Sequence, residues 1–323
     1  MSKPKILLSR RWPSAVEVEL EKHYDVTLNP SDTPMTVGGF RSALQNFDAI
    51  LPTVTDKMSA DVFDDIKPRT KIIGNFGVGY THIDIPAASA AGIAVTNTPG
   101  VLSDCTADLT MTLMLMAARR AGEGERELRA GKWSGWHPTH LQGSRMTGKT
   151  LGIIGYGRIG REVAKRAHFG FGMKILAQNR SKIENGILIR TSAQQVTSIS
   201  ELLEKADFVS LHCPGGAENH HLIGAEQFKQ MKSTAFLINT ARGEVVDEKA
   251  LVRALKTGGI AGAGLDVFDG EPKVNQDLIG CENAVLLPHL GSATRETREA
   301  MGFRVLDNLS DFFGGWEPRD LVA

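Results

Sequence analysis

The chain has 323 residues, of which 41% are hydrophobic, and its 37 Lys and Arg residues balance 37 Asp and Glu residues. This length and hydrophobic fraction suffice for two domains with separate cores. Because the charges balance and no long charged run is present, we expect binding neither to nucleic acid nor to acidic membranes.

The start of the chain has too few apolar residues for the core of a signal peptide, and no run approaches the ~18 apolar residues that span a bilayer. The three cysteines, Cys105, Cys213 and Cys281, are far apart and suit a reducing compartment. The adjacent His220 and His221 are expected to point in different directions on a strand or a helix. The sequence therefore predicts a cytoplasmic protein without a metal site.

In the first hundred residues, short apolar runs alternate with helical segments such as 16–23. The runs cover residues 6–8, 26–28, 49–51, 71–74 and 93–96. Alternation of this kind predicts a parallel sheet covered by helices on both faces, and hence a first α/β domain.

A turn at 97–100 precedes a helix predicted over about 106–121, with Ser103 or Asp104 as its N-cap. The helix is apolar nearly all round, so it should be buried on most sides. It either links two domains and meets a second subunit, or forms the core of one domain. The tryptophans of the next loop, at 133 and 136, indicate an interface, a binding pocket or core packing.

The most informative stretch is 150–160, where an apolar run leads into Gly155-Tyr156-Gly157-Arg158-Ile159-Gly160. A helix over 161–169 and a strand over 173–177 are predicted next, within a unit of about 30 residues. In that context Gly155 permits a tight turn, Gly157 lets the backbone approach a pyrophosphate, and Gly160 lets the helix pack against the strand. The pattern favours a dinucleotide at the helix N-terminus over an ordinary glycine-rich turn.

Further strands are predicted over 208–211, 235–238, 260–267 and 285–287, followed by a helix over 293–313 that returns to the first domain. Arg242, Glu271 and His289 lie where three of these strands should end, which is where an open α/β sheet binds ligands. Together they suit a ketone that carries a carboxylate. Arg242 is a cation for the acid, His289 a proton donor for the carbonyl oxygen, and Glu271 an anion that keeps the donor protonated.

The strand after the glycine motif ends at Asn179-Arg180-Ser181 and has no acidic residue there. An NAD site normally has an Asp or Glu at this position for the ribose 2′-OH. Arg180 and Ser181 instead supply a cation and a hydroxyl for a 2′-phosphate, so NADPH (NADP) is predicted to be preferred over NADH. An ordinary polar turn is the alternative interpretation.

Over nearly its whole length the sequence resembles the D-isomer-specific 2-hydroxyacid dehydrogenases, and within them it is most similar to the glyoxylate/hydroxypyruvate reductases. The resemblance rests on the glycine motif and on the segments 77–84, 95–100, 241–243, 264–267, 271–272 and 288–294. It implies an α/β fold of two doubly wound parallel-sheet domains with a cleft between them. Residues 1–99 and 291–323 would form a flavodoxin-like substrate-binding domain, and 100–290 a Rossmann dinucleotide-binding domain.

The resemblance also implies roles for single residues. Arg242 would bind the substrate carboxylate, His289 would protonate the carbonyl oxygen as hydride arrives, and Glu271 would pair with His289. Backbone N–H groups of Val78 and Gly79 would complete the carboxylate site. In a homodimer, Trp136 would reach the active site of the neighbouring subunit.

The residues predicted to bind the cofactor are Gly155, Gly157, Arg158, Ile159, Gly160, Asn179, Arg180, Ser181, Thr110, His212, Cys213, Pro214, Thr240, Ala241, Arg242, Asp266, His289 and Gly291. By resemblance, Asp266 would lie beside the nicotinamide carboxamide. For Thr110 a polar position facing a domain cleft stays an alternative. Cys213 is either a reactive thiol or, as we expect, a packed side chain.

The leading hypothesis is NADPH-dependent reduction of glyoxylate or hydroxypyruvate to glycolate or D-glycerate. A second hypothesis keeps the fold but takes a larger 2-keto acid or a phosphoglycerate; the end of the chain at Ala323, without room for a regulatory domain, counts against phosphoglycerate. A third is a non-catalytic dinucleotide sensor like the C-terminal-binding corepressors. Because the sequence has no low-complexity tail, we expect an enzyme instead.

Overall fold

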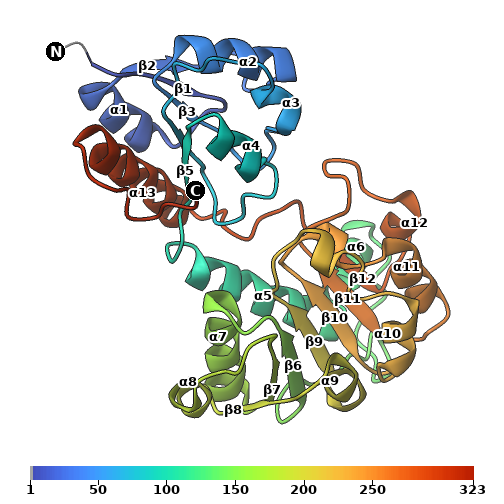
Figure 1. The fold of residues 1–323 in the computed structure, drawn as a ribbon. Helices are drawn as coiled ribbons and strands as arrows, with labels where there is room; N and C mark the ends of the chain where they lie inside the picture. Colours follow the sequence, from blue (N-terminus) through green and yellow to red (C-terminus); the bar gives the residue numbers. More distant parts are fainter. Residues whose placement is uncertain (1–2) are drawn as a thin grey trace. The chain divides into compact units, whose positions relative to one another are not determined.

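The computed structural model describes residues 3–323, which divide into two compact units (Figure 1). Unit 1 runs to Leu102 and also contains Ala293–Ala323, and unit 2 is Ser103–Ser292. The domain boundaries predicted from the sequence lie within three residues of these divisions. Met1 and Ser2, which belong to the predicted first domain and to the segment judged too polar for a signal peptide, lie outside the described residues.

Unit 1 is built on a five-stranded parallel sheet in the order β2-β1-β3-β4-β5. The strands are β1 (Lys5–Leu8), β2 (Asp25–Leu28), β3 (Ala49–Leu51), β4 (Ile72–Gly74) and β5 (Ala94–Thr96). The five apolar runs of the sequence form these strands, with ends that differ by at most one residue. The strand order is that of flavodoxin-like folds, as predicted.

Helices cover both faces of this sheet, as Figure 1 shows. They are α1 (Ser14–His23), α2 (Val37–Asn46), α3 (Ala60–Phe63), α4 (Ile85–Ala90) and α13 (Arg295–Phe313). Ile6 and Leu8 belong to the hydrophobic cluster that contains α1 and α13, whereas Leu7 belongs to the cluster that contains α2, α3 and α4. Successive side chains of a strand point to opposite faces, so β1 contributes to both cores.

Unit 2 contains a seven-stranded parallel sheet in the order β12-β11-β10-β9-β6-β7-β8. The strands are β6 (Thr150–Ile154), β7 (Lys174–Gln178), β8 (Ala193–Gln195), β9 (Phe208–Leu211), β10 (Phe236–Asn239), β11 (Gly262–Leu265) and β12 (Ala284–Leu286). The order reverses at β6, which has β7 on one side and β9 on the other, as in a Rossmann fold. The sequence did not predict β8, because this edge strand consists of Ala-Gln-Gln and has no apolar pattern.

The helices of unit 2 are α5 (Ser103–Ala118), α6 (Ala121–Arg129), α7 (Arg158–Lys165), α8 (Asn185–Arg190), α9 (Ile199–Lys205), α10 (Ala225–Gln230), α11 (Glu248–Lys256) and α12 (Gln276–Ile279). A π-helical turn at Arg166–Gly170 extends α7. Within residues 3–323, no helix is both long enough and apolar enough to cross a bilayer.

The long helix of unit 2 differs from its prediction. It begins at Ser103, so Ser103 and Asp104 are helical residues and not N-caps. It ends at Ala118, and Arg120, with a φ of +53°, separates it from α6. Helix α6 was not predicted because its sequence, rich in Glu and Arg, buries no side chain and has no apolar stripe.

Helix α5 is a core helix of unit 2, which was one of the two interpretations that the sequence left open. Leu113, Met114 and Ala118 are buried and belong to the cluster formed with β6, β7 and α7. Burial is less complete than expected, because Thr112 and Leu115 are exposed. An apolar side chain on the outer face of the helix is therefore left uncovered within this chain.

Candidate active site

The glycine motif joins β6 to α7, at the point where the strand order of the unit 2 sheet reverses. Gly155 has a φ of +89°, and a Cβ there would lie 2.5 Å from the backbone nitrogen of Cys213. A Cβ on Gly160 would lie 2.6 Å from the carbonyl oxygen of Gly155. Only glycine fits these two positions, because the first needs a left-handed turn and the second a close approach of α7 to the strand.

Gly157 has open space beside it, since nothing lies within 4 Å of the position that a Cβ would occupy. It precedes the first residue of α7, and no side chain caps this end of the helix. In the part of the chain that the structure describes, the N–H groups of Arg158 and Ile159 have no hydrogen-bond partner. Free N–H groups beside an open backbone fit the pyrophosphate of a dinucleotide.

The end of β7 is tied to the glycine turn through Asn179. Its Oδ1 accepts a hydrogen bond from the N–H of Tyr156 at 3.4 Å, and its Nδ2 donates to Ser181 Oγ at 2.9 Å. Arg180 projects from the same turn and forms an ion pair with Glu218. The sequence predicted the cation and the hydroxyl, but nothing near β7 pointed to this carboxylate.

Arg242, Glu271 and His289 follow β10, β11 and β12, which are adjacent strands of one sheet. His289 Nδ1 lies 2.8 Å from Glu271 Oε2, so the predicted pair is in hydrogen-bond contact. Glu271 Oε1 accepts a second hydrogen bond from the N–H of Phe268 at 2.9 Å. With Nδ1 held by the carboxylate, the other ring nitrogen of His289 is the one available to a ligand.

The Glu271 carboxyl is held in its ionised form. Burial acts to raise its pKa, but the hydrogen bond and charge of His289, the N–H of Phe268 and the charge of Arg242 outweigh burial, and the pKa is lowered. An ionised carboxylate accepts the hydrogen bond from Nδ1–H and orients the imidazole ring.

Asp266 braces the turn that carries His289. Its side chain is buried, and its two oxygens accept the N–H groups of Leu290 at 2.6 Å and Gly291 at 2.8 Å. The N–H of His289 donates to the carbonyl of Asp266 at 2.9 Å. His289 has a φ of +55°, which is uncommon for a side-chain-bearing residue and persists where the surroundings hold it. The sequence had given Asp266 only a place beside the nicotinamide.

Arg242 supplies a cation that no carboxylate of residues 3–323 neutralises by direct contact. Its guanidinium donates to the carbonyl of Ala241 at 2.6 Å, and Asn239 holds the turn by donating to the carbonyl of Arg242 at 2.8 Å. Burial lowers the pKa of Arg242, and the charges of Glu271 and Glu244 oppose this. A desolvated cation that no carboxylate contacts directly is suited to a carboxylate ligand.

Internal contacts or partial burial constrain Thr110, His212 and Cys213, which the sequence assigned to the cofactor site. Thr110 is fully buried and its hydroxyl lies 3.0 Å from that of Thr240, so it links α5 to the end of β10 instead of facing a surface. His212 Nε2 lies 2.8 Å from Ser210 Oγ, its buried Nδ1 has no partner among the described residues, and burial lowers the pKa of His212 to about 3.

Burial raises the pKa of the Cys213 thiol to about 11, which argues against a reactive thiolate. Pro214, Ala241 and Gly291 follow β9, β10 and β12.

In unit 1, side-chain amides hold the loop that contains Val78 and Gly79. Asn75 Nδ2 donates to the carbonyls of Gly77 at 3.0 Å and Gly79 at 3.1 Å, and Asn97 Nδ2 donates to that of Val78 at 2.8 Å. The N–H groups of Val78 and Gly79 have no partner among the described residues. Two successive N–H groups are thus left for an anion, while the carbonyls are occupied.

Trp133 and Trp136 are 52% and 82% exposed, which excludes core packing within this chain, one of the three interpretations that the sequence left open. One expectation from the sequence is wrong. The rings of His220 and His221 stack with 3.9 Å between their centroids and do not point apart, because His221 has a φ of +51° and lies in a turn. Within residues 3–323, no group of three or more His, Cys, Asp or Glu side chains is placed to hold a metal ion.

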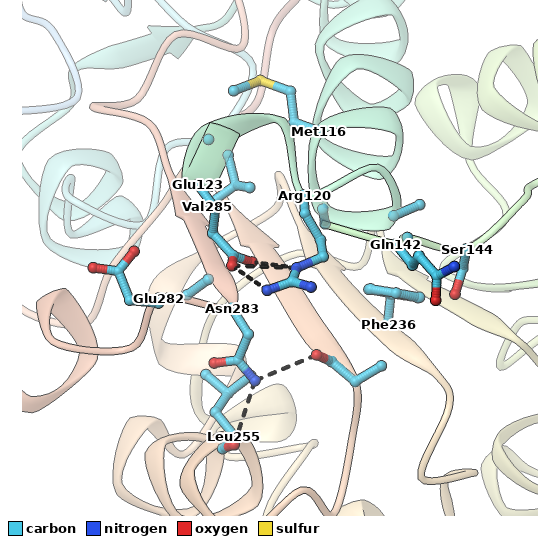
Figure 2. Close-up of a pocket in the computed structure, with 16 residues that line it drawn as sticks. Met116, Arg120, Glu123, Gln142, Ser144, Phe236, Leu255, Glu282, Asn283 and Val285 are labelled. Carbon is cyan, nitrogen blue, oxygen red and sulfur yellow. Dashed lines mark hydrogen bonds and ion pairs between the residues drawn. The ribbon is translucent and has the colours of Figure 1, made fainter. Parts of the chain in front are cut away.

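A cavity of about 480 Å³ lies at the other end of the unit 2 sheet (Figure 2). It is lined by Phe236 at the start of β10, by Ala261 just before β11, by Ala284 and Val285 of β12, and by the end of α5. Arg120, which pairs with Glu123, also lines it. The same strands carry the candidate catalytic residues at their carboxyl ends, so this cavity is separate from them.

A Rossmann sheet with a glycine turn at its switch point, and an acid–base pair beside a free cation at its strand ends, define the chain as a dinucleotide-dependent oxidoreductase. Residues 111–291 match the family model described as the NAD binding domain of D-isomer specific 2-hydroxyacid dehydrogenases. The chain belongs to this family, as its motifs predicted.

Relatives and solved structures agree with this membership. The chain is 44% identical to a glyoxylate reductase of Thermococcus litoralis over 99% of this chain and 97% of that protein. It is similar to the structure of a glyoxylate reductase from Paecilomyes thermophila, with a TM-score of 0.88, 36% identity, and 100% and 99% of the two chains covered. It is also similar to an NADPH-dependent glyoxylate/hydroxypyruvate reductase of Sinorhizobium meliloti in complex with NADP and malonate, with a TM-score of 0.88, 33% identity, and 100% and 97% covered.

Proposed function

We propose that the protein reduces a small 2-keto acid, glyoxylate or hydroxypyruvate, to glycolate or D-glycerate, with NADPH as the preferred cofactor. The observation that carries the proposal is the free Arg242 cation beside the His289–Glu271 pair, at adjacent strand ends of the dinucleotide-binding unit. The similarity to relatives named glyoxylate reductase supports the choice of substrate.

In this proposal Arg242 binds the substrate carboxylate through two parallel N–H donors and so orients the keto group. The N–H groups of Val78 and Gly79 donate to the same carboxylate. His289 donates its free ring N–H to the carbonyl oxygen and transfers that proton, while Glu271 holds the ring. When bound, the nicotinamide supplies the hydride.

The substrate range tests the proposal directly. Steady-state rates with glyoxylate, hydroxypyruvate, pyruvate and phenylpyruvate, each with NADPH and then NADH, are expected to be highest for the two small acids with NADPH. A preference for phenylpyruvate would favour a reductase of larger 2-keto acids. Cofactor binding without turnover of any 2-keto acid would favour a dinucleotide sensor.

Replacing Asn179 by Asp is expected to shift the ratio of kcat/KM with NADPH to kcat/KM with NADH toward NADH by about 10-fold. A carboxylate at the end of the second strand repels a 2′-phosphate and accepts a hydrogen bond from a 2′-OH. Asn185→Asp, on the exposed start of α8, adds the same charge away from the glycine turn and serves as the control. An unchanged ratio in Asn179→Asp would contradict the assignment of this turn.

Replacing Asn75 by Asp is expected to raise KM for the 2-keto acid about 5-fold or more, with little change in KM for the cofactor. Asn75 is buried, and the substitution removes two hydrogen bonds to the loop carbonyls, each contributing about 1 kcal/mol. Kinetics with each substrate varied in turn separate the two KM values. Asn46→Asp on α2, an exposed amide in the same unit, is the control. Equal changes in both KM values would indicate general loss of structure instead.

We also infer a homodimer formed through unit 2. Leu115 on α5, Leu128 on α6, Trp133 and Trp136 are all exposed, and tryptophan is enriched at protein interfaces. In this dimer Trp136 would contribute to the neighbouring active site. Sedimentation as a monomer at micromolar concentration would contradict it.

A cytoplasmic location is part of the proposal. Cys105, Cys213 and Cys281 are all free thiols in the structure. Proteins of oxidising compartments usually pair their cysteines, whereas the cytoplasm keeps them reduced.

A further inference from the structure

A glutamate lies beside the cation that the proposed 2′-phosphate site needs. Glu218 belongs to the helical turn Ala217–Asn219 after β9, and its carboxylate pairs with the guanidinium of Arg180, 38 residues away in sequence. Both side chains are largely exposed, at 70% for Arg180 and 76% for Glu218. The contact is therefore open to a ligand that approaches the end of β7.

The loop that carries Glu218 is anchored next to the glycine turn. Asn219 is buried and donates to the carbonyl of Pro214 at 2.9 Å, and the N–H of Gly216 donates to Glu244 Oε1 at 2.6 Å. The backbone of His212 and Cys213, just before Pro214, packs against Gly155. A Cβ added to Gly155 would lie within 3 Å of it. The backbone under Glu218 is thus held in place, and only the side chain is free to respond to a ligand.

We propose that Glu218 sets the cofactor range of this enzyme by competing with the 2′-phosphate of NADPH for Arg180. A phosphate monoester carries about −1.5 to −2 charges at pH 7. To bind it, Arg180 must leave Glu218, and the Glu218 carboxylate then stays close to a second anion. The proposal rests on the 2′-phosphate site proposed above.

The same carboxylate favours NADH. A ribose with a free 2′-OH brings no negative charge to the end of β7, so the Arg180–Glu218 ion pair stays intact. Glu218 then supplies a hydrogen-bond acceptor for the hydroxyl, the role that an Asp or Glu after the second strand plays in NAD sites. Glu218, in the loop after β9, thus takes the place of the acidic residue that is missing at the end of β7. As a result, the preference for NADPH over NADH is smaller than Arg180 and Ser181 alone would give.

Glu218→Gln keeps the size of the side chain and removes its charge. Isothermal titration of the variant is expected to show 3- to 10-fold tighter binding of NADP⁺ and of 2′,5′-ADP than for the unmodified protein. Binding of NAD⁺ should be unchanged or up to 3-fold weaker. Raising NaCl from about 50 mM to about 500 mM should reduce the difference for NADP⁺, because the two side chains are exposed to solvent and their charges are screened.

Glu226→Gln is the matched control, since Glu226 is an exposed glutamate paired with Lys229 on α10. It makes the same change in net charge and should leave both affinities unchanged. Equal effects of Glu218→Gln on NADP⁺ and NAD⁺, or the same effect in Glu226→Gln, would overturn the proposal.

Arg180→Gln separates this proposal from the one on which it rests. If this variant binds NADP⁺ as tightly as the unmodified protein does, the 2′-phosphate site itself is wrong. If it binds NADP⁺ at least about 10-fold more weakly while Glu218→Gln has no effect, only the role of Glu218 is wrong. If both are right, Glu218→Gln should lose most of its effect when Arg180 is already Gln, because the two side chains act as one coupled pair.

Discussion

Replacing His289 by Ala is expected to lower kcat for 2-keto acid reduction by at least ~10²-fold, the lower end of what a positioned general acid contributes. The reduction consumes a proton at the carbonyl oxygen. Glu271 Oε2, 2.8 Å from His289 Nδ1, orients the imidazole ring to donate that proton. Stopped-flow measurement of NADPH oxidation under saturating substrate gives the rate of the chemical step.

Two further measurements make that result specific. NADP⁺ affinity should be nearly unchanged in His289→Ala, which distinguishes a lost proton donor from a disrupted fold. His220→Ala, at an exposed position of the same unit, should retain full turnover. Near-normal turnover in His289→Ala would show that the proton comes from another group.

Replacing Arg242 by Gln is expected to lower kcat/KM for the 2-keto acid by at least ~10²-fold. Hydrogen bonds to a charged group contribute about 1.5–3 kcal/mol each, and two parallel bonds to the carboxylate are lost. Arg242→Lys should recover only part of the loss, because an ammonium is a point charge and cannot reproduce the planar two-donor geometry.

The loss should appear with the 2-keto acid as the varied substrate and not in the affinity for NADP⁺. Arg253→Gln on α11, at an exposed position, removes the same charge and should have no comparable effect. An unchanged KM for the keto acid in Arg242→Gln would mean that another cation binds the carboxylate.

The strands were the most predictable part of the fold. Buried parallel strands read as short apolar runs, because both of their faces are covered, and runs such as 49–51 and 208–211 became β3 and β9 without any change of bounds. The two elements β8 and α6, which the sequence did not predict, agree with this explanation. The edge strand β8 and the polar helix α6 bury little apolar surface, so neither has an apolar pattern.

The candidate site was predictable to the extent that its residues follow those strands. Gly155, Gly160, Arg242, Glu271 and His289 are found by local spacing, because each lies within a few residues of a strand end and parallel strands end at one edge of a sheet. The family was recognisable from the same short segments, and the family model and the relatives confirm it.

The residues that hold the site in place were not predictable in this way. Asp266 bonds to N–H groups 24 and 25 residues further along the chain, and Glu218 meets Arg180 across 38 residues. Asn97 reaches back 19 residues to hold the carbonyl of Val78. Which distant polar groups meet depends on strand order and loop path, and no local pattern records either.

Local sequence patterns are therefore enough to predict the two parallel sheets, the glycine turn and the positions of the candidate catalytic residues after their strands. Hydrophobic runs and glycine conformations are properties of neighbouring residues. The partners of those groups are a property of the packed molecule. The bracing of His289 by Asp266, the free N–H groups of Val78 and Gly79, and the carboxylate beside Arg180 arise only when segments far apart in sequence are brought into hydrogen-bond distance.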